Sequence, residues 1–159
     1  MDSISTLAHN FLSMKSIAVI GISSSKQTVA NGVYKKLKTP TRTVYAVGKN
    51  TTSFENEPCY PNLGSLPTLV QGVFVAAKPE NTERIVDECI ALHIPFVWIH
   101  HFGGTTFSSG SSAQPHVVKK CRDNGITVIP GACPMMFCDD ADVGHKCIKW
   151  FLSITGKLT

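Results

Sequence analysis

Residues 15–38 constrain the fold of this chain more than any other stretch. An apolar, largely β-branched run at 17–20 ends abruptly at Gly21, which is typical of a strand buried on both faces. The loop that follows, 22–30, consists mostly of small and polar residues, and apolar side chains then recur at helical spacing up to Leu37. The stretch therefore predicts a strand, a tight turn and a helix.

The start of a helix behind such a loop is a place where an anion is stabilised. The first backbone N–H groups of a helix have no partner within it, and the helix dipole is positive at this end. A phosphate group suits both properties. A glycine after a buried strand is also common in α/β proteins that bind nothing there, so the loop alone leaves ligand binding open.

The rest of the chain alternates between predicted strands and helices. Further strands are expected at 43–47, 73–77, 95–99 and 126–129, and further helices within 1–14, 79–92, 114–124 and 140–156. The last of these helices, with its apolar positions between 142 and 154, is expected to pack on the domain. Gly, Pro, Asn and Ser are frequent at 48–71, which predicts a long loop with at most a turn of helix near 66–70.

Strands and helices that alternate at this spacing imply an α/β fold. We expect one doubly wound sheet of about five parallel strands, with right-handed crossovers and helices on both faces. No linker is long enough to divide the chain, so residues 1–159 are expected to form a single domain. A ligand of such a sheet binds outside the carboxyl ends of the strands, where the strand order reverses. With the first strand in the centre, the segments after the first four strands would wall the site.

Charge and composition narrow the range of partners. No stretch reaches the ~18 apolar residues of a membrane span, and no basic flank precedes an apolar run at the N-terminus, so a cytoplasmic protein is expected. The formal net charge of +4 arises without a run of like charges, which argues against nucleic acid and suits a small polyanion. Six cysteines without a C-x-x-C pair indicate free thiols. A homodimer is left open.

Basic residues point to the kind of nucleotide. After Gly21 the second and third glycines of G-x-G-x-x-G are missing, and Lys49 stands where an NAD site would place an acid. A basic residue there suits a phosphorylated ribose, either the 2′-phosphate of NADP or the 3′-phosphate of coenzyme A. Lys26 in the first loop and Lys78 after the third strand can reach the same cleft. Each lysine alone is ordinarily a solvated side chain, but three at neighbouring strand ends favour an anion site.

With these residues laid out, the chain resembles the small, single-domain CoA-binding proteins. Their Rossmann-type fold is similar to the CoA-binding part of the succinyl-CoA synthetase alpha subunit. The resemblance covers about residues 15–158 and is carried, in order, by IAVIGISSS, ANGVYKKL, PCYPNLGSLP, VFVAAKPENTERIVDEC, VWIHHFGG and GITVIPGACPMMF. Relatives usually have Asn-Pro after the second strand, where this chain has Gly48 and Lys49.

The resemblance implies binding of coenzyme A or an acyl-CoA, in a carrier, sensor or subunit without catalysis of its own. Gly21 and Ser23 would hold the diphosphate, and the pantetheine arm would extend toward His100. The residues expected to bind the nucleotide are Gly21, Ile22, Ser23, Ser24, Lys26, Asn31, Gly32, Gly48, Lys49, Ala77, Lys78 and His100.

Two alternatives remain open at this stage. The first is an NADP- or CoA-dependent enzyme that uses Cys133 or His100, since both follow predicted neighbouring strands and a Cys/His pair can act in nucleophilic catalysis. The second is an interaction protein that uses its amphipathic tail helix. No metal site is predicted, because His145 and Cys147 are two residues apart on an expected helix and point to different faces.

Overall fold

The computed structural model describes residues 2–101 and 112–138. The strands are β1 (Ser16–Ile20), β2 (Thr43–Val47), β3 (Ser53–Phe54), β4 (Glu57–Tyr60), β5 (Gly72–Val75), β6 (Phe96–Ile99) and β7 (Thr127–Pro130). The α-helices are α1 (Ile4–Leu12), α2 (Val29–Leu37), α3 (Pro79–Ala91) and α4 (Pro115–Asp123), and two short 3₁₀ helices are η1 (Leu63–Ser65) and η2 (Pro134–Phe137). The expected C-terminal helix at 140–156 lies outside the described residues.

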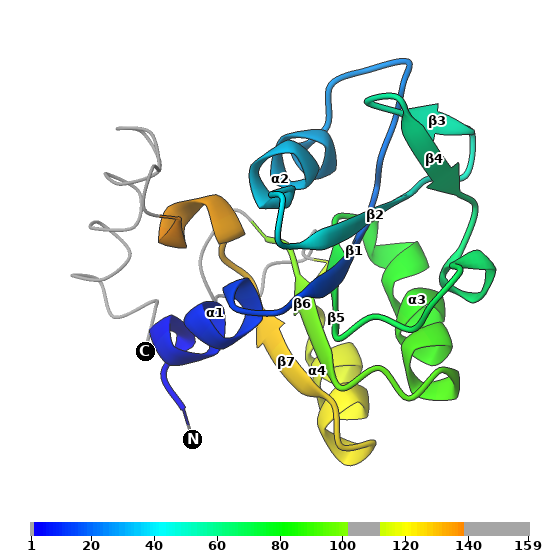
Figure 1. Cartoon of the computed structure of the whole chain (residues 1–159). Helices are drawn as coiled ribbons and strands as arrows, with labels where there is room; N and C mark the ends of the chain where they lie inside the picture. Colours follow the sequence, from blue (N-terminus) through cyan, green and yellow to red (C-terminus); the bar gives the residue numbers. More distant parts are fainter. Residues whose placement is uncertain (1, 102–111, 139–159) are drawn as a thin grey trace.

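The seven strands form one sheet in the order β3-β4-β2-β1-β5-β6-β7 (Figure 1). All neighbouring strands are parallel except β3, which runs antiparallel to β4 at the edge of the sheet. β1 pairs with β2 on one side and with β5 on the other, so the strand order reverses at β1. The expected central position of the first strand is confirmed, and the carboxyl end of β1 is the switch point where such sheets bind ligands.

The predicted α/β fold is confirmed, but the sheet contains two strands beyond the expected five. β3 and β4 form a hairpin inside the segment 48–71, which was expected to be a loop. β3 has two residues and β4 has four, and only one side chain of β4 is buried. Such short elements carry too little alternation to be recognised. Their turn uses Glu55 and Asn56, both with positive φ, rather than the glycine that usually marks a hairpin.

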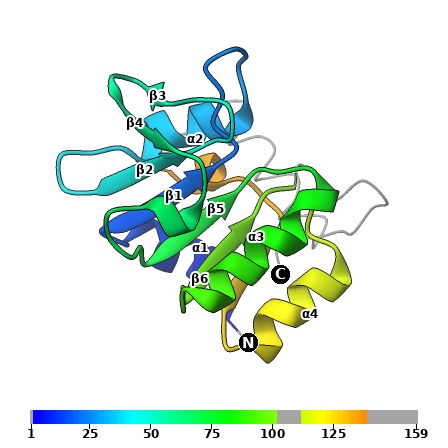
Figure 2. The same ribbon diagram turned by 90° about the vertical axis from the view of Figure 1, so that its right-hand side faces the viewer.

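Helices cover both faces of the sheet (Figures 1 and 2). Alternating side chains along β1 divide the core accordingly: Ile17 and Val19 pack with α1, α2 and η2, whereas Ala18 packs with α3 and α4. On the α1 face, the ring of Phe11 contacts that of Trp98 edge to face, with the ring centroids 5.3 Å apart. Strands buried on both faces explain why the β1 run is apolar throughout.

The helices begin at residues that suit a helix start, although α2 begins at Val29, inside the stretch 22–30 that was expected to be a loop. Thr28 caps α2, because its side chain accepts a hydrogen bond from the amide of Asn31. α3 and α4 both begin at a proline, which tolerates the first helical position since it lacks the N–H group. Among the described residues, no helix has both the length and the apolar character that a membrane span requires.

Candidate functional site

Two glycines allow the loops after β1, β2 and β5 to crowd together. Gly21 has a φ of +112°, and a Cβ atom at this position would lie 2.3 Å from the carbonyl oxygen of Ala76. A Cβ atom on Gly48 would lie 2.3 Å from the carbonyl oxygen of Ile22. Any larger residue would therefore push two loops apart. The two glycines bring the backbones at the switch point into direct contact.

A buried asparagine holds the loop after β1 in shape. Asn31 is 2% exposed, and its side-chain amide donates hydrogen bonds to the carbonyl oxygens of Ser23 and Lys26, at 2.8 and 3.1 Å. Its side-chain oxygen accepts the amide of Ser23 at 3.0 Å. The hydroxyl of Thr28 donates to the carbonyl oxygen of Gly21 at 3.0 Å. Residues 21–28 thus form an internally bonded loop over the start of α2.

This network occupies part of the amides that the sequence offered to a phosphate, namely those of residues 21–24. The amides of Gly21 and Ile22 both donate to the carbonyl oxygen of Val47, and that of Ser24 donates to the hydroxyl of Thr51 at 3.1 Å. At the start of α2, the amide of Val29 has no acceptor within residues 2–101 and 112–138, and Val29 is 40% exposed. The amides of residues 21–24 are thus used within the protein, whereas those of Ser25, Lys26 and Gln27, in the exposed part of the loop, have no acceptor among the described residues.

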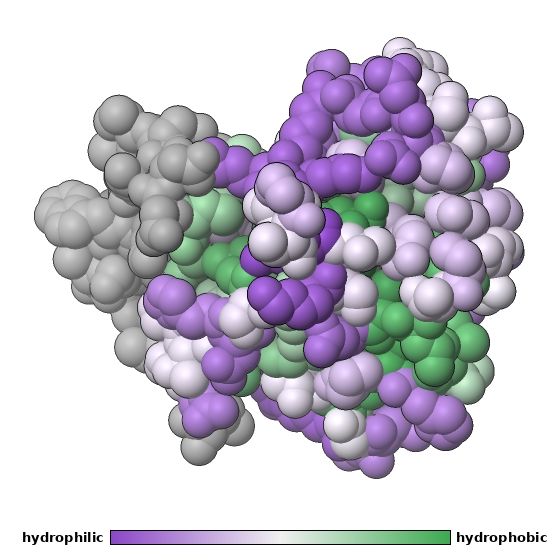
Figure 3. Space-filling model, viewed as in Figure 1, coloured by the Kyte–Doolittle hydropathy of each residue, from purple (hydrophilic) through white to green (hydrophobic). Residues whose placement is uncertain are grey.

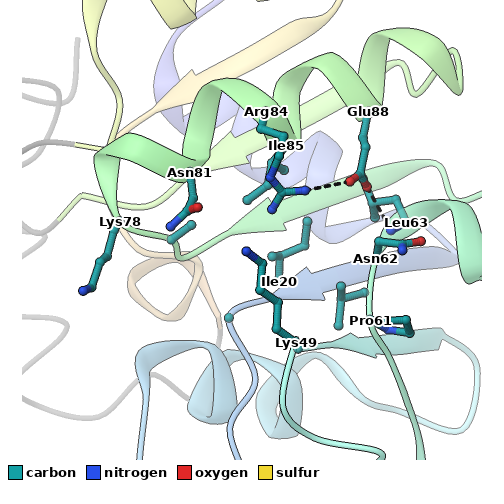
Figure 4. Close-up of a pocket in the computed structure, with 14 residues that line it drawn as sticks. Ile20, Lys49, Pro61, Asn62, Leu63, Lys78, Asn81, Arg84, Ile85 and Glu88 are labelled. Atoms are coloured by element: carbon teal, nitrogen blue, oxygen red, sulfur yellow. Dashed lines mark hydrogen bonds and ion pairs between the residues drawn. The ribbon is translucent and has the colours of Figure 1, made fainter.

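A pocket of about 160 Å³ opens beside this loop, between the carboxyl ends of β1 and β2, the segment around η1, and α3 (Figure 4). Its walls are mainly apolar. The lining residues are Ile20, Gly21, Val47, Gly48, Lys49, Pro61, Asn62, Leu63, Ala77, Lys78, Asn81, Arg84, Ile85 and Glu88. We call it the α3 pocket. Concave, mostly apolar sites with a few convergent polar groups are typical of ligand binding.

The charged side chains of the α3 pocket are mainly positive. Lys49, Lys78 and Arg84 oppose the single carboxylate of Glu88, a formal balance of +2. Glu88 is engaged within the protein: it accepts hydrogen bonds from Arg84 at 2.9 Å and from the amide of Leu63 at 3.1 Å. Lys49 and Lys78 have no acidic partner in the part of the chain that the structure describes. The pocket therefore carries positive charge that an anionic ligand could neutralise.

A second, more polar pocket lies on the other side of the loop, between the loop and the β3–β4 hairpin. It is lined by Ser23, Ser24, Ser25, Lys26, Gln27, Asn31, Lys35, Ser53, Phe54 and Glu55. The charges of this pocket are partly paired, because the Nζ atom of Lys35 lies 3.1 Å from the Oε1 atom of Glu55. In Figure 3, hydrophilic residues gather over this upper part of the molecule, whereas hydrophobic residues surface lower down, on the side of α3. We call this second pocket, between the loop and the β3–β4 hairpin, the α2 pocket.

The structure divides the predicted site residues between these places. The α3 pocket brings together Gly21, Gly48, Lys49, Ala77 and Lys78, whereas the α2 pocket is lined by Ser23, Ser24, Lys26 and Asn31. Ile22, Gly32 and His100 line neither of the two. The three lysines expected in one cleft are thus separated, with Lys26 on the far side of the loop from Lys49 and Lys78.

His100 and Cys133 lie apart from the α3 pocket. The ring of His100 packs 5.8 Å from that of Phe74, and burial lowers the pKa of His100, an effect opposed by the nearby backbone of Ala132. Its Nδ1 atom is buried and has no hydrogen-bond partner among the described residues. Cys133 is 2% exposed. No group of three or more metal-ligating side chains occurs within the described ranges.

Sequence reasoning missed the contribution of α3 and of the segment before it. Asn81, Arg84, Ile85 and Glu88 follow one another at spacings of three, one and three, so they form a single stripe on α3, and this pattern was available in the sequence. Asn62 was not predictable in the same way, because its place depends on the unrecognised β3–β4 hairpin.

Fold and pocket together define a class: a Rossmann-like, doubly wound α/β domain with a positively charged pocket at the switch point. Similar solved structures share the fold. A hypothetical protein from Pyrococcus horikoshii OT3 matches with a TM-score of 0.72 and 23% identity, over 86% of this chain and 91% of that one. The dinucleotide-forming acetyl-coenzyme A synthetase 1 of Ca. Korarchaeum cryptofilum matches with a TM-score of 0.58 and 16% identity, over 72% of this chain and 25% of the synthetase.

Within that class, the chain belongs to the CoA binding domain family, whose sequence profile matches residues 15–139. The predicted resemblance is thereby confirmed. Among curated proteins, the ADP-forming acetate–CoA ligase I of Archaeoglobus fulgidus is 32% identical over 75 residues. That match covers 47% of this chain and only 11% of the ligase.

Proposed function

We propose that this protein binds coenzyme A or an acyl-CoA in the α3 pocket. The observation that carries the proposal is the pairing of apolar walls with two lysines, Lys49 and Lys78, that have no acidic partner among the described residues. Coenzyme A combines an aromatic base with several phosphate charges, so it matches both properties. Membership of the CoA binding domain family supports the same ligand.

The lining of the pocket suggests how the nucleotide would lie. Ile20, Val47 and Ile85 offer apolar surface on which an adenine ring can pack, and the side chains of Asn62 and Asn81 offer hydrogen bonds to its edge. Lys78 stands at the start of α3 and extends away from the pocket in Figure 4. From there its ammonium group can meet the diphosphate where the ligand leaves the pocket.

We further propose a binding role, as a carrier, sensor or subunit, rather than catalysis. The enzyme alternative needs Cys133 or His100 next to the ligand, but Cys133 is buried and neither residue lines the α3 pocket. A homodimer stays a prediction, which the molecular mass in solution, with and without coenzyme A, would decide.

Isothermal titration calorimetry of the full chain with coenzyme A, acetyl-CoA and NADPH tests the proposal. We expect coenzyme A and acetyl-CoA to bind at micromolar concentration and NADPH to bind at least about tenfold more weakly, a difference of about 1.4 kcal/mol. Failure of both CoA species to bind below millimolar concentration would overturn the proposal. If NADPH binds more tightly than both CoA species, the proposed ligand is wrong, whereas the proposed binding pocket is not.

A further inference from the structure

Among the described residues, Arg84 is the one cation of the α3 pocket that a carboxylate holds in place. It lies on α3, and its Nη1 atom donates to the Oε1 atom of Glu88 one turn later, at 2.9 Å. The other carboxylate oxygen of Glu88 accepts the amide of Leu63 at 3.1 Å. Glu88 therefore joins α3 to η1 and fixes the direction of the guanidinium group at the same time.

The hydrogen bond to Glu88 uses only part of the guanidinium group. Arginine carries five N–H donors in a planar fork, and this fork matches the oxygens of a phosphate. The side chain of Arg84 is 51% exposed, so the remaining donors are accessible to a ligand. In Figure 4, the group extends from α3 over the pocket, above Ile20.

Lys49 faces Arg84 across the same space. It follows β2, on the opposite wall of the pocket from α3, and Figure 4 draws both side chains pointing toward the region near Ile20. Two cations that face each other repel, and Glu88 offsets only the charge of Arg84. An anion placed between them would contact both charges at once, and a phosphate monoester carries close to two negative charges at neutral pH.

We propose that Arg84, positioned by Glu88, forms with Lys49 a clamp for a phosphate monoester on the ribose of the bound nucleotide. The clamp makes Arg84 a specificity-determining residue: the pocket selects coenzyme A over dephospho-CoA, which differs only in lacking the 3′-phosphate. This inference rests on the proposed function, since it assumes that a CoA-like nucleotide enters the α3 pocket.

An ordinary surface ion pair is the competing explanation, because Arg84 and Glu88 are four residues apart on a helix. The structure offers a comparison. Lys119 and Asp123 form another such pair on α4, yet neither lines the α3 pocket. What distinguishes the pair on α3 is the second bond of Glu88 to η1 and the position over the pocket. A pair that merely stabilises its helix would leave ligand selectivity unchanged.

Calorimetric titration of coenzyme A and of dephospho-CoA into wild type and Arg84→Gln separates these explanations. Wild type should prefer coenzyme A by at least about tenfold, as expected for a charge-assisted bond to phosphate. In R84Q, affinity for coenzyme A should fall by about tenfold while that for dephospho-CoA stays within about twofold. Arg122→Gln, which removes an arginine of α4 outside the pocket, should leave both affinities unchanged.

Two further variants complete the test. Arg84→Lys keeps the charge but loses the fork, so it should recover only part of the preference. Glu88→Gln should lower the preference without removing the arginine, and thermal unfolding of each variant checks that the fold is kept. If R84Q lowers the affinity for both ligands equally, or for neither, the proposed clamp is wrong and the proposed function stands. If wild type binds neither ligand, the proposed function itself fails.

Discussion

The loop after β1 and the α3 pocket lie side by side at the switch point, but they use their polar groups in opposite ways. The first four amides of the loop, at residues 21–24, point inward to Val47, Asn31 and Thr51, so that this part of the loop is hydrogen-bonded without a ligand. The pocket leaves Lys49 and Lys78 without acidic partners in the described chain. The difference indicates that the loop is a scaffold and that the pocket supplies the attraction for an anion. Changes in the loop should therefore affect stability first, and changes in the pocket should affect binding.

Gly21→Ala should have the largest effect on stability. Its φ of +112° and the 2.3 Å approach to the carbonyl oxygen of Ala76 leave no room for a Cβ atom. We expect the free energy of unfolding to fall by about 2–4 kcal/mol, measured by urea denaturation. Gly125→Ala is the matched control. Gly125 also has a positive φ, of +73°, but no atom lies within 4 Å of its Cβ position, so the cost should stay near 1 kcal/mol. Equal losses would show that crowding at the switch point does not matter.

Asn31→Ala should have the second-largest effect on stability, because it removes a buried side-chain amide that makes three hydrogen bonds to the loop backbone. The variant leaves those backbone groups without their partner, so we expect a loss of about 1–3 kcal/mol in the free energy of unfolding. Asn10→Ala, at an exposed position of α1, should change it by less than about 0.5 kcal/mol. A loss of CoA affinity with unchanged stability would contradict the scaffold role and would make Asn31 a direct ligand contact.

Lys49→Gln and Lys78→Gln should show the reverse pattern. Both lysines are exposed and lack an acidic partner within the described residues, so their removal should leave the free energy of unfolding within about 0.5 kcal/mol. The dissociation constant for coenzyme A should rise by about tenfold in each, since a charged contact to phosphate is lost. Lys15→Gln, at the amino end of β1, is the control and should bind like wild type. If both pocket variants bind coenzyme A as tightly as wild type, the charges of Lys49 and Lys78 do not contribute to binding.

His100 should give the smallest effect, a change in pH dependence. Burial lowers its pKa, so below the pKa of about 6.5 of an unfolded histidine the unfolded chain binds a proton that the folded protein does not. The free energy of unfolding should therefore fall as the pH drops from 6.5 toward the folded pKa, and level off below it. His100→Gln should lack this component. The measurement is urea denaturation at pH 7.5 and 5.5, and a constant difference between wild type and variant at the two pH values would contradict the prediction.

The sequence predicted the scaffold better than the pocket. The apolar run at 17–20 and the prolines that open α3 and α4 act through local chemistry, so most strands and helices were found near their true ends. The occupied amides of the loop were not foreseen, because they depend on Asn31 folding back and on Thr51 approaching from a distant segment. The separation of Lys26 from the other two lysines likewise depends on which side of the loop each faces.

A map of amide chemical shifts in ¹⁵N-labelled protein, recorded as coenzyme A is added, tests the central claim most directly. If the α3 pocket holds the nucleotide, the largest changes should occur at Lys49, Asn62, Ala77 and Arg84, with small changes at Ser25–Gln27. Changes confined to the α2 pocket, around Ser25 and Glu55, would contradict the account.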